Sequence, residues 1–323
     1  MNKLPFEKIE RKILIRKEAE TNPEFKADNS VKTLINYGIV NIDKPKGPTS
    51  HQVSEYVQRI LGINKSGHSG TLDPAVTGVL PIALGRATRI VECLLHAGKE
   101  YVALMHLHKE VSEDKIKSVF NEFTGKIKQK PPIKSSVKRV VREREVYYIE
   151  ILEKDGKDIL FRIGCQAGTY IRKICHDIGQ RLGVGAHMAE LRRTKAGCFD
   201  ESTLFTLQDL ADAYWHYKND GKEKFIRKVI QPIENAIRHL PKVWVLDTTV
   251  ESLCHGVDLK VPGIAKVESG IENKDNVAIM TLKNELIALG TAKLKSSEMI
   301  GDKGLAIFTE KVFMEPGVYK KAL

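Results

Sequence analysis

A glycine-bearing segment, Gly67–Gly78, carries an aspartate in a setting that could do chemistry. Asp73 precedes Pro74, and a proline disfavours helical backbone in the residue before it, so we expect the carboxylate on a loop. The glycines around it would let a ligand approach the backbone closely. A carboxylate in such a loop could serve as a nucleophile. An Asp-Pro pair is also an ordinary turn signal, and the segment alone does not decide between these readings.

The same glycines do not form a nucleotide-binding motif. The phosphate-binding pattern Gly-x-x-x-x-Gly-Lys-Ser/Thr is missing, and no convincing dinucleotide fingerprint occurs in the chain. A reaction that depends on ATP or NAD is therefore unsupported. An RNA methyltransferase is disfavoured as well, because no glycine-rich cofactor loop follows a strand. His106 and His108 share one face of a predicted strand, but no third ligand can be named, so we expect no metal site.

Hydrophobic periodicity predicts the elements that must position this loop. The pattern indicates strands over residues 37–43, 101–108 and 159–165, and helices over 49–62, 112–123 and 171–182. Thr49 could cap the first helix with Gln52 three residues on, and Gly62 would end it. Strands and helices alternate without a repeated βαβ period. This favours an α+β fold with a largely antiparallel sheet.

The C-terminal part of the chain has a different character. Short strands are predicted over 277–282, 286–290 and 305–308, with one helix near 248–255, which is typical of a small β-barrel-like module. The net charge of the whole chain is +11, yet residues 241–323 carry no arginine and as many lysines as acidic residues. The basic excess therefore lies before residue 241, where it suits a polyanion such as nucleic acid. Residues 1–34 are charge-rich and poorly periodic, and we expect an extension that docks or stays mobile.

Composition limits the cellular setting. The five cysteines are scattered singly, which indicates reduced thiols rather than a disulfide framework or a zinc knuckle. No stretch approaches the roughly 20 apolar residues needed to cross a bilayer. The charged N-terminus has no apolar signal region. We therefore expect a cytoplasmic protein without a membrane association.

Several motifs in the first 200 residues resemble those of one enzyme family. Gly67–Gly78 resembles the catalytic-aspartate motif of the TruB/dyskerin family of pseudouridine synthases. The other family motifs follow the family order: Asn41–Ser50 (first motif), Lys99–Tyr101 (tyrosine strand), Cys165–Arg172 (arginine motif) and Met188–Gly197 (last motif). Leu253–Ile264 is similar to part of a PUA RNA-binding domain. The long N-terminal extension and this tail fit the archaeal, guide-RNA-dependent branch better than the bacterial one.

This resemblance implies a domain plan and a set of partners. It implies an N-terminal extension over 1–35 that packs on the PUA domain, a pseudouridine synthase domain over 36–238 and a PUA domain over 240–316. The implied partners are RNA (an H/ACA guide RNA, with rRNA or tRNA as substrate) and the small core proteins of the H/ACA ribonucleoprotein. The substrate could be chosen by the guide RNA or read directly in the T-loop of tRNA. A non-catalytic RNA-binding scaffold is the alternative, although it need not retain all the catalytic motifs.

The resemblance also implies roles for individual residues. Asp73 would be the nucleophile, and it would attack either the uracil ring or the ribose C1′. Arg172 would pair with Asp73, and Tyr101 would stack on the flipped base and help to move a proton. Four further residues are expected to bind substrate: Lys44, His68, Tyr170 and Leu191. No cofactor and no metal is required, because pseudouridine is an isomer of uridine.

A basic, proline-bearing segment remains without a fixed interpretation. Residues 129–139, which continue to Arg142 and Arg144, could be a solvated loop. They could equally form a mobile flap whose lysines follow an RNA backbone.

Overall fold

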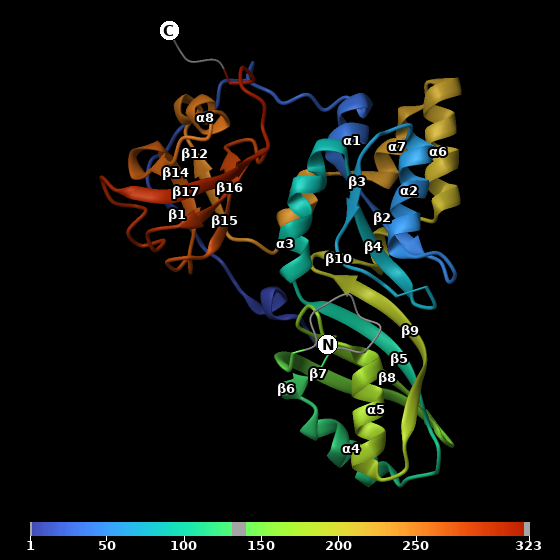
Figure 1. The fold of residues 1–323 in the computed structure, drawn as a ribbon. Helices are drawn as coiled ribbons and strands as arrows, with labels where there is room; N and C mark the ends of the chain where they lie inside the picture. Colours follow the sequence, from blue (N-terminus) through green and yellow to red (C-terminus); the bar gives the residue numbers. More distant parts are fainter. Residues whose placement is uncertain (1, 131–139, 320–323) are drawn as a thin grey trace. The chain divides into compact units, whose positions relative to one another are not determined.

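The computed structural model describes residues 2–130 and 140–319 (Figure 1). The chain divides into two compact units. The first comprises residues 1–8, 40–82 and 91–229, and the second comprises residues 9–39, 83–90 and 230–323. The architecture is mixed α+β, as the sequence predicted. In the described part of the chain, no helix is long and apolar enough to cross a membrane.

A curved mixed sheet forms the frame of the first unit, with the strand order β2-β4-β9-β5-β8-β7-β6. Its central strand β5 is antiparallel to both neighbours, β8 and β9, whereas β4 and β9 run parallel. The bounds are β2 (Gly38–Lys44), β3 (Ser66–His68), β4 (Thr77–Leu84), β5 (Lys99–Leu107), β6 (Gly125–Gln129), β7 (Arg142–Asp155), β8 (Asp158–Cys165), β9 (Ala186–Ala196) and β10 (Phe199–Asp200). The pairs that β5 and β7 form with their neighbours are antiparallel, whereas the β4–β9 pair, which adjoins the predicted catalytic loop, is parallel.

Helices cover this sheet where the sequence places apolar stripes. The bounds are η1 (Pro5–Lys8), α2 (Ser50–Leu61), α3 (Val91–His96), α4 (Glu113–Glu122), α5 (Ile171–Leu182), η3 (Glu201–Thr203), α6 (Leu207–Asp220) and α7 (Glu223–Val229). The α5 stripe of Ile171, Ile174, Ile178 and Leu182 is buried in one core with Phe120 of α4 and the inward side chains of β5 and β8. The helix predicted over 171–182 is confirmed, and Gly183 ends it in the left-handed conformation (φ 78°).

The ends of α2 follow the predicted chemistry. The Thr49 side chain accepts a hydrogen bond from the Gln52 amide and the Gln52 side chain reaches back to Thr49, so the capping box is complete. Gly62 ends the helix with φ 63°. Because Ser50 is the first residue of this helix, the cap also fixes the position of its hydroxyl. That hydroxyl contacts the aspartate loop, as described below.

The second unit contains a seven-stranded sheet with the order β1-β14-β12-β15-β16-β17-β13. Its elements are β1 (Ile13–Ile15), α1 (Val31–Tyr37), η2 (Gly85–Ile90), β11 (Ile230–Pro232), η4 (Ile233–Ile237), β12 (Lys242–Val245), α8 (Asp247–Cys254), β13 (Leu259–Lys260), η5 (Val261–Gly263), β14 (Ile264–Glu268), β15 (Asn276–Thr281), β16 (Leu286–Ala292) and β17 (Leu305–Val312). The predicted tail strands and helix are present.

The N-terminal extension has more structure than its sequence indicated. Strand β1 pairs with β14, with Leu14 opposite Val267. The ring of Phe25 lies 5.1 Å from that of Tyr319, measured between centroids. Helix α1 was not predicted, and Ser30 caps it by accepting a hydrogen bond from the Thr33 amide. Residues 9–39 therefore belong to the same compact unit as the C-terminal module.

Candidate active site

The loop that carries Asp73 is held at several points. It connects β3 to β4. The Leu72 amide donates a hydrogen bond to Ser50 Oγ at 2.8 Å, and the Gly47 amide donates to the Pro74 carbonyl at 2.8 Å. The side chains of Leu72 and Val76 on either side are buried, whereas Asp73 itself is exposed. The loop is thus anchored by its flanks while the carboxylate stays accessible.

Asp73 is paired with Arg172, as the resemblance implies. Arg172 Nη2 lies 2.5 Å from Asp73 Oδ2. Arg172 is in the first turn of α5, which begins at Ile171. The two side chains are 57% and 62% exposed, and such a pair contributes only about 0–1 kcal/mol to folding stability. The guanidinium therefore does more to orient the carboxylate than to stabilise the fold.

Tyr101 lies on β5 directly opposite Arg193 of β9. Tyr101 is half-buried, and burial raises the pKa of its hydroxyl, so the residue is a neutral phenol at neutral pH. Arg193 is only 1% exposed. Its Nε donates to the Val79 carbonyl at 2.7 Å, its Nη2 donates to the Gly70 carbonyl at 3.3 Å, and its guanidinium interacts with the Tyr101 hydroxyl. Arg193 thus joins the tyrosine strand, β4 and the aspartate loop.

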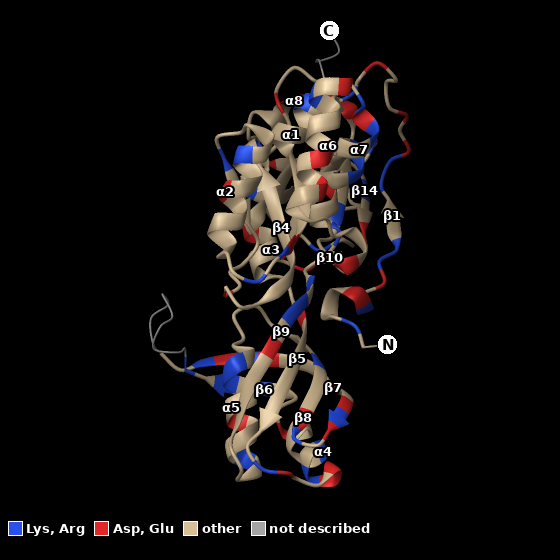
Figure 2. Ribbon diagram, turned by 90° about the vertical axis from the view of Figure 1, so that its right-hand side faces the viewer, with Lys and Arg blue, Asp and Glu red and all other residues tan. Residues whose placement is uncertain are grey.

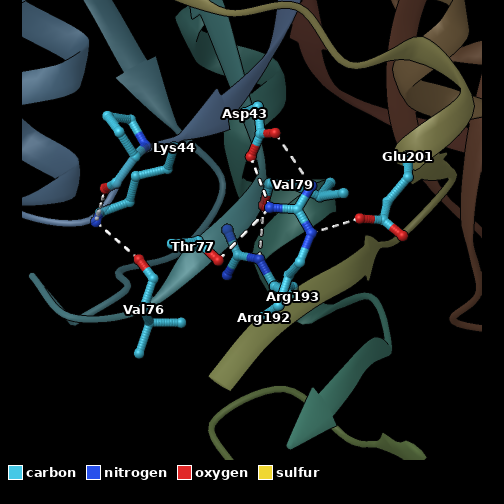
Figure 3. Close-up of polar contacts among 9 residues, drawn as sticks. Asp43, Lys44, Val76, Thr77, Val79, Arg192, Arg193 and Glu201 are labelled. Carbon is cyan, nitrogen blue, oxygen red and sulfur yellow. Dashed lines mark hydrogen bonds and ion pairs between the residues drawn. The ribbon is translucent and has the colours of Figure 1, made fainter. Parts of the chain in front are cut away.

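Neither Arg193 nor its neighbour Arg192 was among the site residues predicted from the sequence. Arg192 forms a two-point ion pair with Asp43, at 2.9 and 3.0 Å, and its Nε donates to Glu201 at 2.6 Å (Figure 3). Figure 3 also shows Arg193 reaching the Val79 carbonyl beside it. Two adjacent arginines on a strand must point to opposite faces, and this was the signal that could have revealed a buried arginine.

The structure places Lys44 differently from our expectation. We expected substrate contact, but its side chain is fully buried. Its Nζ donates to the carbonyls of Pro45, Pro74 and Val76 at 2.9, 3.3 and 2.8 Å, and the contact with Val76 is visible in Figure 3. Burial, followed by the nearby Arg193 charge, lowers the pKa of Lys44. Lys44 acts on the site through the aspartate loop, because its three donors are directed at backbone carbonyls.

The other expected substrate residues lie on the elements around the loop. His68 ends β3 and is half-buried, and burial, then the Arg193 charge, lowers its pKa, so it is neutral at neutral pH. Its Nδ1 is buried with no hydrogen-bond partner among the described residues. Tyr170 caps α5, and its backbone exchanges hydrogen bonds with the Gln129 side chain at 3.0 and 3.2 Å. Leu191 of β9 lies opposite Ala103 of β5. Like Tyr101, it packs against the hydrophobic core that contains Phe120 and the α5 stripe.

Two other expectations concern the edges of the first unit. His106 and His108 meet His187 at the end of the β5–β9 pair, where His108 Nε2 lies 3.2 Å from His187 Nδ1. Within residues 2–130 and 140–319, no group of three or more His, Cys, Asp or Glu is arranged to hold a metal ion.

Most of the basic segment over 129–139 lies outside the described residues. Within the described residues, strand β9 carries both basic and acidic side chains (Figure 2).

Comparison with known proteins identifies the family. The TruB family pseudouridylate synthase N-terminal domain matches residues 58–171, and the tRNA pseudouridylate synthase B C-terminal domain matches residues 172–238. The PUA domain matches residues 241–313, and the DKCLD (NUC011) domain matches residues 2–54. These matches together span both units.

Full-length relatives agree with these matches. A probable tRNA pseudouridine synthase B of Pyrococcus abyssi is 57% identical over 97% of this chain and 96% of its own length. The Nanoarchaeum equitans counterpart is 53% identical over 98% of this chain and 92% of its own length. A solved Cbf5-Nop10-Gar1 complex contains a chain that is 56% identical, with a TM-score of 0.94 over 99% of this chain and 98% of that one. An H/ACA ribonucleoprotein bound to a substrate RNA contains another, 53% identical, with a TM-score of 0.93 over 99% of both chains. The chain belongs to the TruB/Cbf5 family of pseudouridine synthases.

Proposed function

We propose that this chain converts uridine to pseudouridine in RNA with Asp73 as the nucleophile, within a particle that contains a guide RNA. The observation that carries the proposal is the Asp73–Arg172 pair. The carboxylate is held by a guanidinium at 2.5 Å on an anchored loop, yet 62% of its side chain is exposed and open to a substrate. Tyr101 and Leu191, on paired strands, supply the aromatic and apolar surfaces that a flipped base requires.

The reaction needs only groups that this chain supplies. The bond between N1 of uracil and the ribose C1′ breaks, a bond between C5 and C1′ forms, the hydrogen at C5 leaves as a proton, and N1 takes up a proton. No electrons are transferred. Asp73 forms a covalent bond either to the uracil ring or to C1′, and it is released as a carboxylate when the product forms. Both routes use the same carboxylate, and both need the base to rotate relative to the sugar.

The surrounding residues prepare this site before RNA binds. Arg172 orients the carboxylate, and the side chains of Lys44 and Ser50 hold the loop by hydrogen bonds to its backbone. Tyr101 offers a neutral hydroxyl for proton transfer at the base. His68, which burial keeps neutral, lies at the end of β3 just before the loop, where we expect it to contact the substrate RNA.

The comparisons support a guide-RNA particle as the setting. Relatives more than half identical over nearly the whole chain occur in solved complexes named for Cbf5, Nop10 and Gar1 and for an H/ACA ribonucleoprotein with substrate RNA. The relatives named tRNA pseudouridine synthase B support tRNA as a second substrate. The C-terminal module, residues 241–323, has no net charge and no arginine. It would therefore recognise an unpaired RNA end by shape and base contacts rather than by counterion release.

Tritium release tests the reaction and the substrate together. RNA with tritium at C5 of the target uridine is incubated with the chain, its small partner proteins and a guide RNA, and separately with tRNA and the chain alone. We expect release that needs the pairing guide in the first case, and release at the T-loop uridine in the second. A control guide with a scrambled pairing region should abolish the first signal only. RNA binding without release from either substrate would favour the scaffold alternative and contradict the proposal.

A further inference from the structure

Strand β9 pairs with β5 in a register that changes twice. Glu100 lies opposite Lys195, but Tyr101 lies opposite Arg193, so Thr194 is an extra residue on β9. A second shift separates Leu104, opposite Glu190, from Met105, opposite Met188. Each shift is a β-bulge, a feature that re-aims side chains next to active sites. The residues between the two bulges, 190–193, are displaced by one position from the pairing on either side.

This displacement determines which side chains face the active site. Directly opposed residues of an antiparallel pair share one face, so Arg193 lies on the face of Tyr101, and Leu191 lies on the face of Ala103. If the register at Lys195 continued without the bulge, Thr194 would lie opposite Tyr101. Arg193 and Leu191 would then turn to the other face of the sheet, because a slip of one residue reverses every side chain.

The bulged residue is held by a buried carboxylate. The Thr194 hydroxyl donates to Glu100 Oε1 at 2.8 Å, and the Tyr148 hydroxyl donates to Glu100 Oε2 at 2.5 Å. All three residues are buried: Thr194 is 8% exposed, Glu100 is 6% exposed and Tyr148 is 7% exposed. Burying a carboxylate costs free energy unless hydrogen bonds compensate. A carboxylate at this position therefore favours the arrangement in which both hydroxyls reach it.

Tyr148 reaches Glu100 by crossing an intervening strand. Gly164 of β8 lies opposite both Glu100 and Tyr148. A Cβ on Gly164 would be only 2.3 Å from the Tyr148 ring, so any side chain there would block the path. The β7–β8 register also shifts between Val146 and Tyr148. The network thus runs through the adjacent strands β7, β8, β5 and β9, which lie side by side in Figure 1.

We propose that Glu100, Thr194 and Tyr148 are positioning residues that hold the β9 bulge and so keep Arg193 and Leu191 on the active-site face. None of the three needs to contact RNA. They lie on the opposite face of the sheet from Tyr101 and act through the register of the strand. The inference rests on the proposed function, since its readout is the rate of pseudouridine formation.

The test compares Thr194→Val with Thr194→Ser in the assembled particle at saturating RNA. Valine keeps the shape and strand preference of threonine but removes the hydroxyl, whereas serine retains it. We expect the valine variant to lose about 10²-fold in single-turnover rate, because small misplacements at an active site cost about that much. The apparent affinity for RNA should stay within about threefold of wild type. The serine variant should retain most of the rate. Tyr148→Phe, which removes the other donor without changing shape, should lower the rate in the same direction.

Thr203→Val is a matched control in the same unit. The Thr203 hydroxyl accepts a hydrogen bond from the fully buried Asn41 side chain at 2.9 Å. This variant therefore also takes a hydroxyl partner away from a buried polar side chain. It should lower the melting temperature without a comparable loss of rate. Should Thr194→Val not fold, Tyr148→Phe and Thr194→Ser decide the outcome alone.

Two results would overturn the inference. One is a Thr194→Val or Tyr148→Phe rate equal to that of wild type or of Thr203→Val. The other is a Thr194→Ser rate as low as that of Thr194→Val in a folded protein. Both results can occur while wild type turns over and Asp73→Asn is inactive, so they are distinguishable from failure of the proposed function.

Discussion

Arg172 Nη2 lies 2.5 Å from Asp73 Oδ2, although the two residues are 99 positions apart in the sequence. The first comes from the first turn of α5, and the second comes from the loop between β3 and β4. Both side chains are more than half exposed. Water screens such a pair, so its contribution to stability is small. We therefore expect the pair to matter for what the carboxylate does to a bound substrate, which the next two variants test.

Replacing Arg172 by lysine tests whether the shape of the guanidinium matters. Lysine retains the charge but loses the planar fork that fixes a carboxylate. We expect the single-turnover rate of Arg172→Lys to fall about 10²-fold or more, by analogy with other misplaced catalytic groups. RNA affinity and the melting temperature should change little, because the pair is exposed.

Arg181→Lys is the matched control on the same helix. Arg181 Nε lies 2.7 Å from Glu122 Oε2 in another exposed pair. That variant should turn over like wild type. If Arg172→Lys also keeps the wild-type rate, the pairing with Asp73 has no catalytic role.

Lys44→Met tests the support beneath the aspartate loop. The variant removes the Lys44 donor from the buried Val76 carbonyl, and an unsatisfied buried polar group costs about 1–3 kcal/mol. We expect the free energy of unfolding, measured with urea, to fall by about that amount. The pseudouridylation rate should fall while RNA affinity is retained. The exposed neighbour Lys46 provides the control. Lys46→Met should leave the free energy of unfolding and the pseudouridylation rate near wild type. A weaker RNA affinity with an unchanged loop would instead restore the role of Lys44 in substrate binding.

The lowered pKa of His68 predicts a pH dependence of stability. Burial disfavours the protonated imidazole in the folded chain, whereas the unfolded chain takes up a proton near the ordinary pKa of about 6.5. As the pH falls below about 6.5, the unfolded state therefore binds more protons and the folded state loses stability. His68→Gln should make the urea midpoint less sensitive to pH between about 7.5 and 5. The exposed His96→Gln serves as control. Parallel pH curves for wild type and His68→Gln would contradict this account.

Periodicity was sufficient to predict the helices that carry the site. The stripe from Ile171 to Leu182 is buried on one face of α5, and the cap at Thr49 begins α2. These features depend on residues close together in the sequence, so local chemistry determines them. Asp73 and Arg172 were predicted from a resemblance, and their contact could not follow from spacing, because they are far apart in the chain.

Other parts of the site depend on pairing between distant strands. The bulge at Thr194 exists because β9 must satisfy β5 in two registers, and no local sequence signal reports a cross-strand register. Arg193 is consequently buried beside Tyr101, although arginine is among the residues least often buried. The burial of Lys44 likewise depends on residues that are distant in the sequence. Its three acceptor carbonyls belong to Pro45, which precedes α2, and to Pro74 and Val76, which follow it.

The central claim, that Asp73 is the nucleophile, is tested most directly by Asp73→Asn. The amide nearly keeps the shape of the side chain but removes its charge, so RNA should still bind. We expect the variant to release no tritium from C5-labelled uridine and to form no pseudouridine, at saturating RNA and over many wild-type turnover times. Circular dichroism identical to that of wild type would show that the fold is intact. Measurable pseudouridine from a preparation free of wild-type protein would contradict the assignment.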